Sequence, residues 1–289
     1  MSILFVKIKE EKMDKFNRIC RDIKNLKIQG AENVAKAAAK ALLIRHDKKA
    51  IKKLISLRPT EPCLRNTIKF ILSHSEIKEG VKKALLHFDL SEKKIAEIGS
   101  KLIENNSTIF THCHSNTVMS ILLKAKEKGK KFKVIATETR PLYQGHITAL
   151  QLSKAKIPVT LVIDSAARVA LKESDIMLIG CDAITTTRIY NKIGSEMFAI
   201  MAKQLDIPVY VATNSWKFDV KSIYGTEEKI EKRSEKEIWS NAPRGVKILN
   251  PAFEKINPDL ISGIISELGI FMRKSFIEAI KDTYPFIFK

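Results

Sequence analysis

The first third of the chain carries the spacing of amphipathic helices. Apolar residues recur every three or four positions, the period expected of a helix with one buried face. The stretches with this pattern are 13–26, 31–44, 64–72 and 78–103. The second is rich in alanine, the strongest helix former, and Pro59 and Pro62 interrupt the pattern before the third. We therefore predict a helical N-terminal domain over residues 1–105.

Beyond residue 105 the pattern changes to short apolar runs separated by segments of helical period. The apolar runs are 107–111, 132–136, 158–163, 176–179 and 208–212, and the helical segments include 118–128 and 194–205. Strands that alternate with helices are typical of a parallel sheet wound in α/β fashion. Nearly continuous Val, Ile and Leu fit strands that are covered on both faces. We therefore expect the α/β fold class, with an α/β domain and a mainly parallel sheet over residues 106–289.

Polar and ionisable residues follow each of the predicted strands. The segments at these strand ends are 111–117, 137–141, 164–168, 180–183 and 213–217. In an open α/β sheet, ligands bind at the carboxyl ends of the strands, where loops meet helix N-termini. We therefore expect these segments to line one active-site rim.

Cys113 is the first chemical candidate on this rim, flanked by His112 and His114. An isolated cysteine is most often a small buried hydrophobe. Here it lies between a strand end and a helix start, where the helix N-terminus favours the thiolate, a usable base or nucleophile. The two histidines are poor direct partners, because neighbours on an extended strand point to opposite faces.

Asp182 is the second candidate and follows a buried strand. It could simply cap a helix or form a turn. A partly desolvated carboxyl that faces Cys113 would instead have a raised pKa, which suits proton donation.

The sequence also suggests an anionic, phosphorylated ligand. Both standard phosphate loops are missing, G-x-x-x-x-G-K-[ST] and G-x-G-x-x-G, which argues against nucleoside triphosphate and dinucleotide chemistry. Segment 115–117, Ser-Asn-Thr, opens a predicted helix, and helix N-termini favour anions. Arg58, Lys192 and Lys217 could be surface charges, but together they would suit a phosphate group.

The charge balance is strongly basic, with 51 Lys and Arg against 32 Asp and Glu and a formal net charge of +19. Such a balance can indicate nucleic-acid binding. However, only 11 of the basic residues are arginine, the residue favoured for base and phosphate recognition. We therefore do not expect nucleic acid as the main partner, and most lysines are interpreted as solvated surface.

The cysteines, histidines and apolar runs of the chain argue against a metal site, a membrane-spanning helix and export. The 4 cysteines form no C-x-x-C pair, and the His112-x-His114 pair has no third ligand, so no metal or cofactor is expected. No run of 18 apolar residues is present, and the apolar stretch near the N-terminus is too short for a signal peptide. We expect a cytoplasmic protein.

The rim motifs, in their order along the chain, resemble one family. It comprises the methylthioribose-1-phosphate isomerases, the archaeal ribose-1,5-bisphosphate isomerases, and the α, β and δ subunits of translation initiation factor 2B. The resemblance covers residues 15–270 and rests on Thr-His-Cys-His-Ser at 111–115, Thr-Glu-Thr-Arg-Pro at 137–141, Asp-Ser-Ala-Ala at 164–167, Gly-Cys-Asp-Ala-Ile at 180–184, Asn-Lys-Ile-Gly at 191–194, Trp-Lys-Phe at 216–218 and Leu-Arg-Pro-Thr at 57–60. Segments 139–141 and 164–168 look closest to the ribose-1,5-bisphosphate isomerase branch.

The resemblance implies a Rossmann-like α/β catalytic domain and an aldose–ketose isomerase of a sugar 1-phosphate, converting ribose 1,5-bisphosphate to ribulose 1,5-bisphosphate in AMP metabolism. Cys113 would be the proton acceptor and Asp182 the proton donor, without metal or cofactor. A homo-oligomer is expected by the same resemblance. The substrate-binding residues carried over are Gln29, Gly30, Ala31, Glu32, Arg58, Ser115, Asn116, Thr117, Asn191, Lys192 and Lys217.

Two departures leave the exact substrate open. Gln29-Gly30-Ala31-Glu32 stands where the isomerase branch usually has Arg-Gly-Ala-Gly, and a carboxylate is unfavourable beside a phosphate. The turn before Asn191 is Thr-Thr-Arg at 186–188 rather than the usual Asn-Gly turn. The alternative is a non-catalytic regulatory subunit resembling translation initiation factor 2B, which would bind a nucleotide or sugar phosphate and associate with initiation factor 2. Retention of both Cys113 and Asp182 favours the isomerase.

Overall fold

The computed structural model describes residues 2–226, 230 and 232–289 of the chain. It contains two compact units. The helical unit consists of Met1–Leu90, Trp216–Phe218 and Lys281–Lys289, and the α/β unit of Ser91–Ser215 and Asp219–Ile280. The division therefore falls inside a long helix rather than after residue 105, and the C-terminal residues join the helical unit. The hydrophobic pattern does not reveal a division inside helix α5 (Ile77–Gly99), because the helix is periodic throughout.

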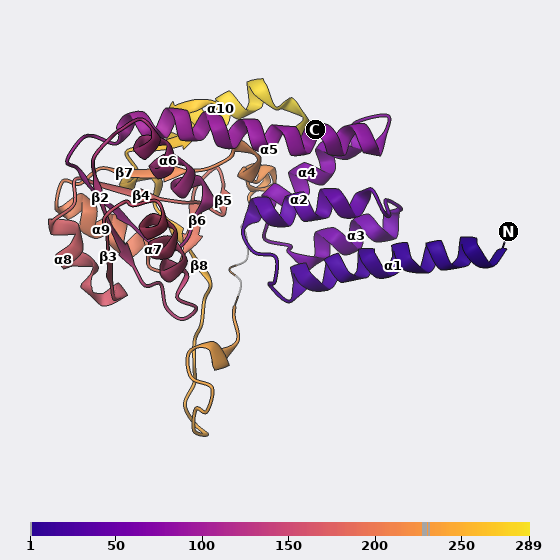
Figure 1. The fold of residues 1–289 in the computed structure, drawn as a ribbon, viewed down its shortest axis with the longest axis horizontal. Coiled ribbons are helices and arrows are strands. Elements are labelled where there is room, and N and C mark those ends of the chain that lie inside the picture. The colour runs from indigo at the N-terminus through magenta and orange to yellow at the C-terminus, as the bar shows by residue number, and fades with distance from the viewer. Residues whose placement is uncertain (1, 227–229, 231) are drawn as a thin grey trace. The chain divides into compact units, whose positions relative to one another are not determined.

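The helical unit is built from consecutive α-helices (Figure 1, indigo to purple). They are α1 (Ser2–Lys24), α2 (Ala31–Leu42), α3 (Lys48–Leu57), α4 (Pro62–Leu72) and the first part of α5. The four predicted helical stretches correspond to α1, α2, α4 and α5. The sequence prediction missed α3, although its N-cap signal is clear: the Asp47 side chain accepts hydrogen bonds from the backbone N–H of Lys49 and Ala50.

The α/β unit contains a seven-stranded sheet in the order β10-β9-β7-β4-β1-β2-β3. All neighbouring strands are parallel except β9 and β10. The strands are β1 (Thr108–Thr111), β2 (Lys133–Thr137), β3 (Val159–Val162), β4 (Ile176–Ile179), β7 (Val209–Ala212), β9 (Gly263–Ser266) and β10 (Gly269–Phe271). The five predicted strands and the α/β fold class are thus confirmed.

The helices of this unit are interleaved with the strands, as Figure 1 shows. They are α6 (Asn116–Glu127), α7 (Gln144–Lys154), α8 (Ala167–Lys172), α9 (Ser195–Gln204) and α10 (Arg273–Thr283, its last residues in the helical unit). Short 3₁₀ turns are η1 (Ser100–Leu102), η2 (Asp164–Ala166), η3 (Ser215–Lys217), η4 (Val220–Tyr224), η5 (Glu235–Glu237), η6 (Pro258–Leu260) and η7 (Pro285–Ile287). None of the helices in the described part of the chain is long and apolar enough to cross a membrane.

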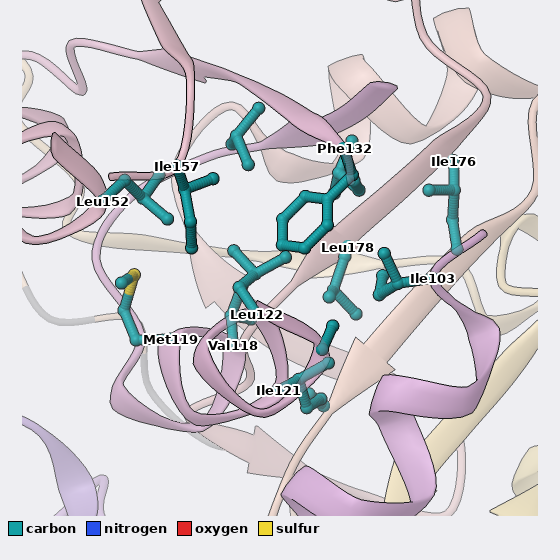
Figure 2. Packing of buried hydrophobic residues seen from close by; sticks show 14 of the residues in the cluster. Ile103, Val118, Met119, Ile121, Leu122, Phe132, Leu152, Ile157, Ile176 and Leu178 are labelled. Atoms are coloured by element: carbon teal, nitrogen blue, oxygen red, sulfur yellow. The ribbon is translucent and has the colours of Figure 1, made fainter. Parts of the chain in front are cut away.

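A dense apolar cluster fixes the central strands against α6. Val118, Ile121 and Leu122 of α6 pack with Phe132 and with Leu178 of β4 (Figure 2), and all are almost fully buried. Burial of side chains of this size contributes roughly 1.5–3 kcal/mol each. The end of β1 and the start of α6 are therefore held on a rigid base, and the turn between them carries Cys113.

A second, three-stranded antiparallel sheet was not predicted. Its strands are β5 (Ala183–Ile184), β6 (Ile189–Lys192) and β8 (Phe253–Ile256), in the order β5-β6-β8. Two of its strands are very short or end in polar residues, so they lack the continuous apolar run that reveals the main strands. The sheet matters for function because Asp182 directly precedes β5 and Lys192 ends β6.

Candidate active site

Cys113 lies in the turn between β1 and α6, as predicted. Its φ of +67° is in the left-handed region, which is strained for a residue with a side chain. Two threonines hold this conformation: the Cys113 N–H donates to Thr139 Oγ1 at 3.0 Å, and its carbonyl accepts from Thr148 Oγ1 at 3.1 Å. The strained turn is therefore fixed from both sides, which fits a functional rather than a packing role for the thiol.

Ser115 caps α6 as the sequence predicted. Its hydroxyl accepts a hydrogen bond from the Val118 N–H at 3.4 Å. Gly180, at the end of β4, approaches it so closely that a Cβ atom there would lie 2.6 Å from Ser115 Oγ. Only glycine lets the two strand ends come together at this point. The Cys113 turn and the Asp182 turn are thus brought into proximity by a residue without a side chain.

His112 links the Cys113 strand to the loop after Lys192. Its Nε2 lies 2.9 Å from the Ile193 carbonyl oxygen and its Nδ1 lies 2.6 Å from Thr137 Oγ1. Because a carbonyl can only accept, Nε2 carries the proton and Nδ1 accepts from the threonine hydroxyl. Burial lowers the pKa of His112 to about 4, so the ring is neutral. His112 therefore ties the end of β1 to β2 and to the loop after Lys192, a role that no sequence pattern indicates.

Asp164 organises the neighbouring loop. Its carboxylate accepts hydrogen bonds from the backbone N–H of Thr139 at 2.9 Å and of Arg140 at 2.7 Å. Thr139 also has a positive φ, of 63°. Asp164 thereby sets the place of the Thr139 hydroxyl, which in turn receives the Cys113 N–H. The sequence contained this carboxylate in a motif, but only the structure reveals what it holds.

The electrostatics of Cys113 contradict one expectation. Burial, the largest cause, raises the pKa of the thiol to about 11; the positive charge of Lys192 opposes this, and the carboxylates of Asp182 and Asp164 add to it. The helix N-terminus was expected to favour the thiolate. Desolvation and two negative charges outweigh the favourable groups, so the thiol of the unliganded site is protonated near neutral pH.

Asp182 is half-buried in the turn between β4 and β5, where its backbone N–H donates to the Tyr190 carbonyl at 2.9 Å. It is not a helix cap. Its charge acts on the Cys113 thiol, as does that of Lys192. The α/β unit therefore brings Asp182 and Lys192 within electrostatic reach of the Cys113 thiol.

Other predicted residues of this unit have defined partners. Asn191 is buried and donates to Ser195 Oγ at 2.9 Å, and that hydroxyl donates to the Lys192 carbonyl at 2.6 Å. The Lys192 ammonium lies 5.4 Å from the centre of the Phe253 ring, a cation–π distance. Asn191 therefore stabilises the loop that carries Lys192.

The N-terminal segment of α2 belongs to the helical unit. Gly30 is the N-cap with a φ of +84°, and Gln29 Nε2 donates to the Leu26 carbonyl at 2.7 Å. Ala31 is buried in the first turn. The Glu32 carboxylate forms an ion pair with Lys36 at 2.9 Å. The Glu32 carboxylate, which departs from the family pattern, is therefore paired with a cation of its own helix.

Arg58 and Lys217 also lie in the helical unit, and both are buried. Arg58 Nη2 donates to the Glu61 carboxylate at 2.8 Å. Burial strongly raises the pKa of the nearby Cys63 thiol; the charge of Lys217 lowers it, and those of Glu32 and Glu61 raise it. Two cations and two carboxylates thus gather around this part of the unit. Glu61 was missed by sequence reasoning, although its position beside Arg58-Pro59-Thr60 could have suggested it.

Comparison with known proteins shows the family of the chain. Residues 19–273 match the sequence model of the Initiation factor 2 subunit family. The chain belongs to that family. A ribose 1,5-bisphosphate isomerase from Methanocaldococcus jannaschii is 37% identical, and the match covers 91% of this chain and 93% of that protein. A putative methylthioribose-1-phosphate isomerase from the same organism is 36% identical, with 86% and 83% covered.

Among solved structures, the chain is similar to the translation initiation factor eIF-2B of Pyrococcus horikoshii. The TM-score is 0.79 at 28% identity, and the match covers 89% of this chain and 96% of that one. The sequence relatives show that this member of the Initiation factor 2 subunit family is an isomerase.

The rim of this family member is equipped for proton transfer. Within the described residues, no group of three or more His, Cys, Asp or Glu side chains could hold a metal ion. His112 is hydrogen-bonded as described, and His114 lies 3.0 Å from Thr148 Oγ1 and 3.2 Å from Asn116 Oδ1. The Cys113 thiol and the Asp182 carboxyl are two groups near the strand ends that can exchange protons.

Proposed function

We propose that the chain is an aldose–ketose isomerase of a sugar 1-phosphate, with ribose 1,5-bisphosphate as substrate and ribulose 1,5-bisphosphate as product. The observation that carries the proposal is the Cys113 thiol, held in a strained turn and within the electrostatic reach of Asp182. The relatives named ribose 1,5-bisphosphate isomerase support the substrate class.

The chemistry requires one acid and one base. A phosphate on C1 blocks ordinary opening of the sugar ring to a free aldehyde. The ring oxygen must therefore be protonated as its bond to C1 breaks. Asp182 donates that proton, and the Cys113 thiolate takes the proton from C2 to give an enol. The Cys113 thiol then returns its proton to C1, while the hydroxyl proton on O2 passes to Asp182. The ketose forms, and both side chains regain their starting protonation.

The coupling between the two groups explains how the reactive form arises. The negative charge of Asp182 raises the pKa of the Cys113 thiol, so a proton placed on Asp182 removes part of that penalty. The tautomer with protonated Asp182 and Cys113 thiolate is the one competent for reaction. The charge of Lys192 stabilises the thiolate in that tautomer.

We propose that the phosphates are bound by helix N-termini and cations. In the α/β unit these are the start of α6, formed by Ser115, Asn116 and Thr117, together with Lys192 and the supporting Asn191. In the helical unit, the candidates are the start of α2, from Gln29 to Glu32, with Arg58 and Lys217. The pairing of Glu32 with Lys36 reduces the repulsion that this carboxylate would exert on a phosphate.

The test is turnover of purified protein on ribose 1,5-bisphosphate, with detection of the ketose. Cys113→Ser and Asp182→Asn should each lower kcat by at least about a hundredfold, the usual contribution of a general acid or base. Cys20→Ala, which alters a buried cysteine of the helical unit, is the matched control and should retain activity. No ketose from the wild type, or unchanged rates in both site variants, would refute the proposal.

A parallel assay with methylthioribose 1-phosphate decides the substrate, because one relative carries that name at similar identity. If the protein prefers methylthioribose 1-phosphate, the proposed mechanism stands and this compound is the substrate instead of ribose 1,5-bisphosphate. The regulatory-subunit alternative predicts no turnover, thermal stabilisation by AMP or a ribose phosphate, and association with initiation factor 2.

We also propose a homo-oligomer assembled through the α/β unit. Strand β3 is an edge of the main sheet, and α7 packs beside it. These elements and their flanks expose several large apolar side chains: Ile147, Leu150, Leu161, Ile163 and Val169. Exposed apolar groups on a sheet edge are a frequent basis for association. The cytoplasmic location and the role in AMP metabolism stay predictions from sequence.

A further inference from the structure

Lys217 lies in a short segment that is fastened on both sides by one buried side chain. Asn66 of α4 donates from Nδ2 to the carbonyl oxygens of Trp216 and Phe218, each at 2.8 Å. These are the residues immediately before and after Lys217. Both N–H groups of the Asn66 amide therefore donate to the backbone on either side of Lys217. Asn66 and the segment 216–218 belong to the helical unit.

The rings of the same two flanking residues are packed independently of Asn66. Trp216 stacks on His87 with ring centres 3.9 Å apart, and Phe286 packs against it at 5.3 Å. Phe218 stacks on Phe288 at 5.5 Å. Aromatic residues of α5 and of the C-terminal segment thus hold the rings, whereas Asn66 holds the peptide groups. Substitution of Asn66 would therefore remove the hydrogen bonds to the Trp216 and Phe218 carbonyls and leave the packing of their rings in place.

We infer that Asn66 is a positioning residue for Lys217, directing its ammonium to a phosphate of the substrate. The inference rests on the proposed function for the role of Lys217. A lysine has a long flexible stem, so the place of its charge depends on how well its backbone is fixed. Lys217 is only 8% exposed, which leaves its side chain few directions once both flanking carbonyls are held.

The first experiment compares substitutions at Asn66 with a neighbouring control. Asn66→Asp keeps the shape and removes the donors; Asn66→Ala removes both without adding charge. Thr67→Val is the matched control, because Thr67 is buried on the same helix and its hydroxyl donates within that helix, to the Cys63 carbonyl at 2.7 Å. With ribose 1,5-bisphosphate we expect KM to rise about tenfold in both Asn66 variants while kcat changes less than about threefold. Thr67→Val should leave KM unchanged.

A double-mutant cycle separates positioning from general destabilisation. If Asn66 acts through Lys217, Asn66→Ala should have no further effect on KM in a Lys217→Met background. Fully additive effects, or an equal KM change in Thr67→Val, would overturn the inference. Thermal unfolding of every variant confirms that the folded protein is being compared.

A second measurement does not depend on turnover. The rate at which Lys217 is acetylated by acetic anhydride, followed by mass spectrometry of the folded protein, reports how firmly the ammonium is held. It should rise several-fold in Asn66→Asp and Asn66→Ala and stay constant in Thr67→Val. An unchanged rate in both Asn66 variants would overturn the inference. Absence of turnover in the wild type would instead refute the proposed function and leave this measurement to decide the role of Asn66.

Discussion

At the scale of single residues, the site presents a thiol that is harder to ionise than free cysteine. Its neighbours explain this: burial and two carboxylates disfavour the thiolate, and one lysine favours it. A thiol with a raised pKa is protected from oxidation and alkylation at neutral pH, because the thiolate is the reactive form. The same arrangement makes the reactive state depend on the pair of residues rather than on Cys113 alone.

The raised pKa of Cys113 predicts a loss of stability in alkaline solution. Burial raises this pKa from 9.0 to about 11, so the folded state keeps the proton longer than the unfolded chain does. The corresponding stabilisation is fully present below the unfolded value and is lost as pH rises from about 9 to about 11, by roughly 2–3 kcal/mol at most. Serine does not titrate in this range, so Cys113→Ser should lose less stability over it.

Urea unfolding of both proteins at the two ends of this pH interval measures the difference. Other buried cysteines, such as Cys63, titrate in both proteins and cancel in the comparison. An equal alkaline loss in wild type and Cys113→Ser would contradict the electrostatic account of the site.

At the scale of elements, the site depends on how closely β4 approaches the start of α6. The contact allows no side chain at Gly180, because a Cβ there would lie 2.6 Å from Ser115 Oγ and 2.7 Å from Ser115 Cβ. These atoms belong to the residue that caps α6. Any shift of Ser115 therefore moves the turn that holds Cys113.

Gly180→Ala should consequently impair both stability and catalysis. We expect a loss of about 1–3 kcal/mol, typical of overpacking in a tight region, and a fall in kcat of at least about tenfold because the Cys113 turn moves. Gly129→Ala is the control: Gly129 has a positive φ of 80°, but nothing lies within 4 Å of the added Cβ. It tests backbone strain alone. Chemical denaturation and steady-state kinetics measure both effects, and equal losses in the two variants would argue against a special role for the β4–α6 contact.

The elements also show which parts of the fold a sequence can reveal. Five of the seven strands of the main sheet and most α-helices were predicted because their apolar residues repeat with a clear period over enough positions, whereas β9 and β10 were not. The sheet of β5, β6 and β8 was not, because β5 has two residues and β6 ends in Asn191 and Lys192. The sequence could name candidate site residues on the predicted strand ends, Asp164 among them. The hydrogen bonds that Asp164 and Asn66 make to backbone groups depend on distant partners that no local pattern encodes.

At the scale of the whole molecule, the net charge of +19 has no single purpose. Lys192 and Lys217 exert their charge on thiols inside the two units. Other lysines form local ion pairs, such as Lys36 with Glu32 and Lys128 with Glu97. The proposed anionic substrate needs only a few cations, and exposed lysines account for much of the rest.

The exposed apolar side chains on α7 and β3 lead to the last prediction, which concerns assembly. Leu150 of α7 is 56% exposed and lies three residues along the helix from Ile147, which is also exposed, and apolar patches mark interaction surfaces. We expect the wild type to sediment as a multiple of its 32.7 kDa chain mass, and Leu150→Glu to shift the distribution toward the monomer, because a carboxylate buried at an interface lacks a partner. Leu90→Glu, at a similarly exposed leucine of the helical unit, is the control and should leave the mass unchanged. Analytical ultracentrifugation over a concentration series distinguishes the outcomes. A monomeric wild type, or equal shifts in both variants, would show that the α7–β3 surface does not mediate assembly.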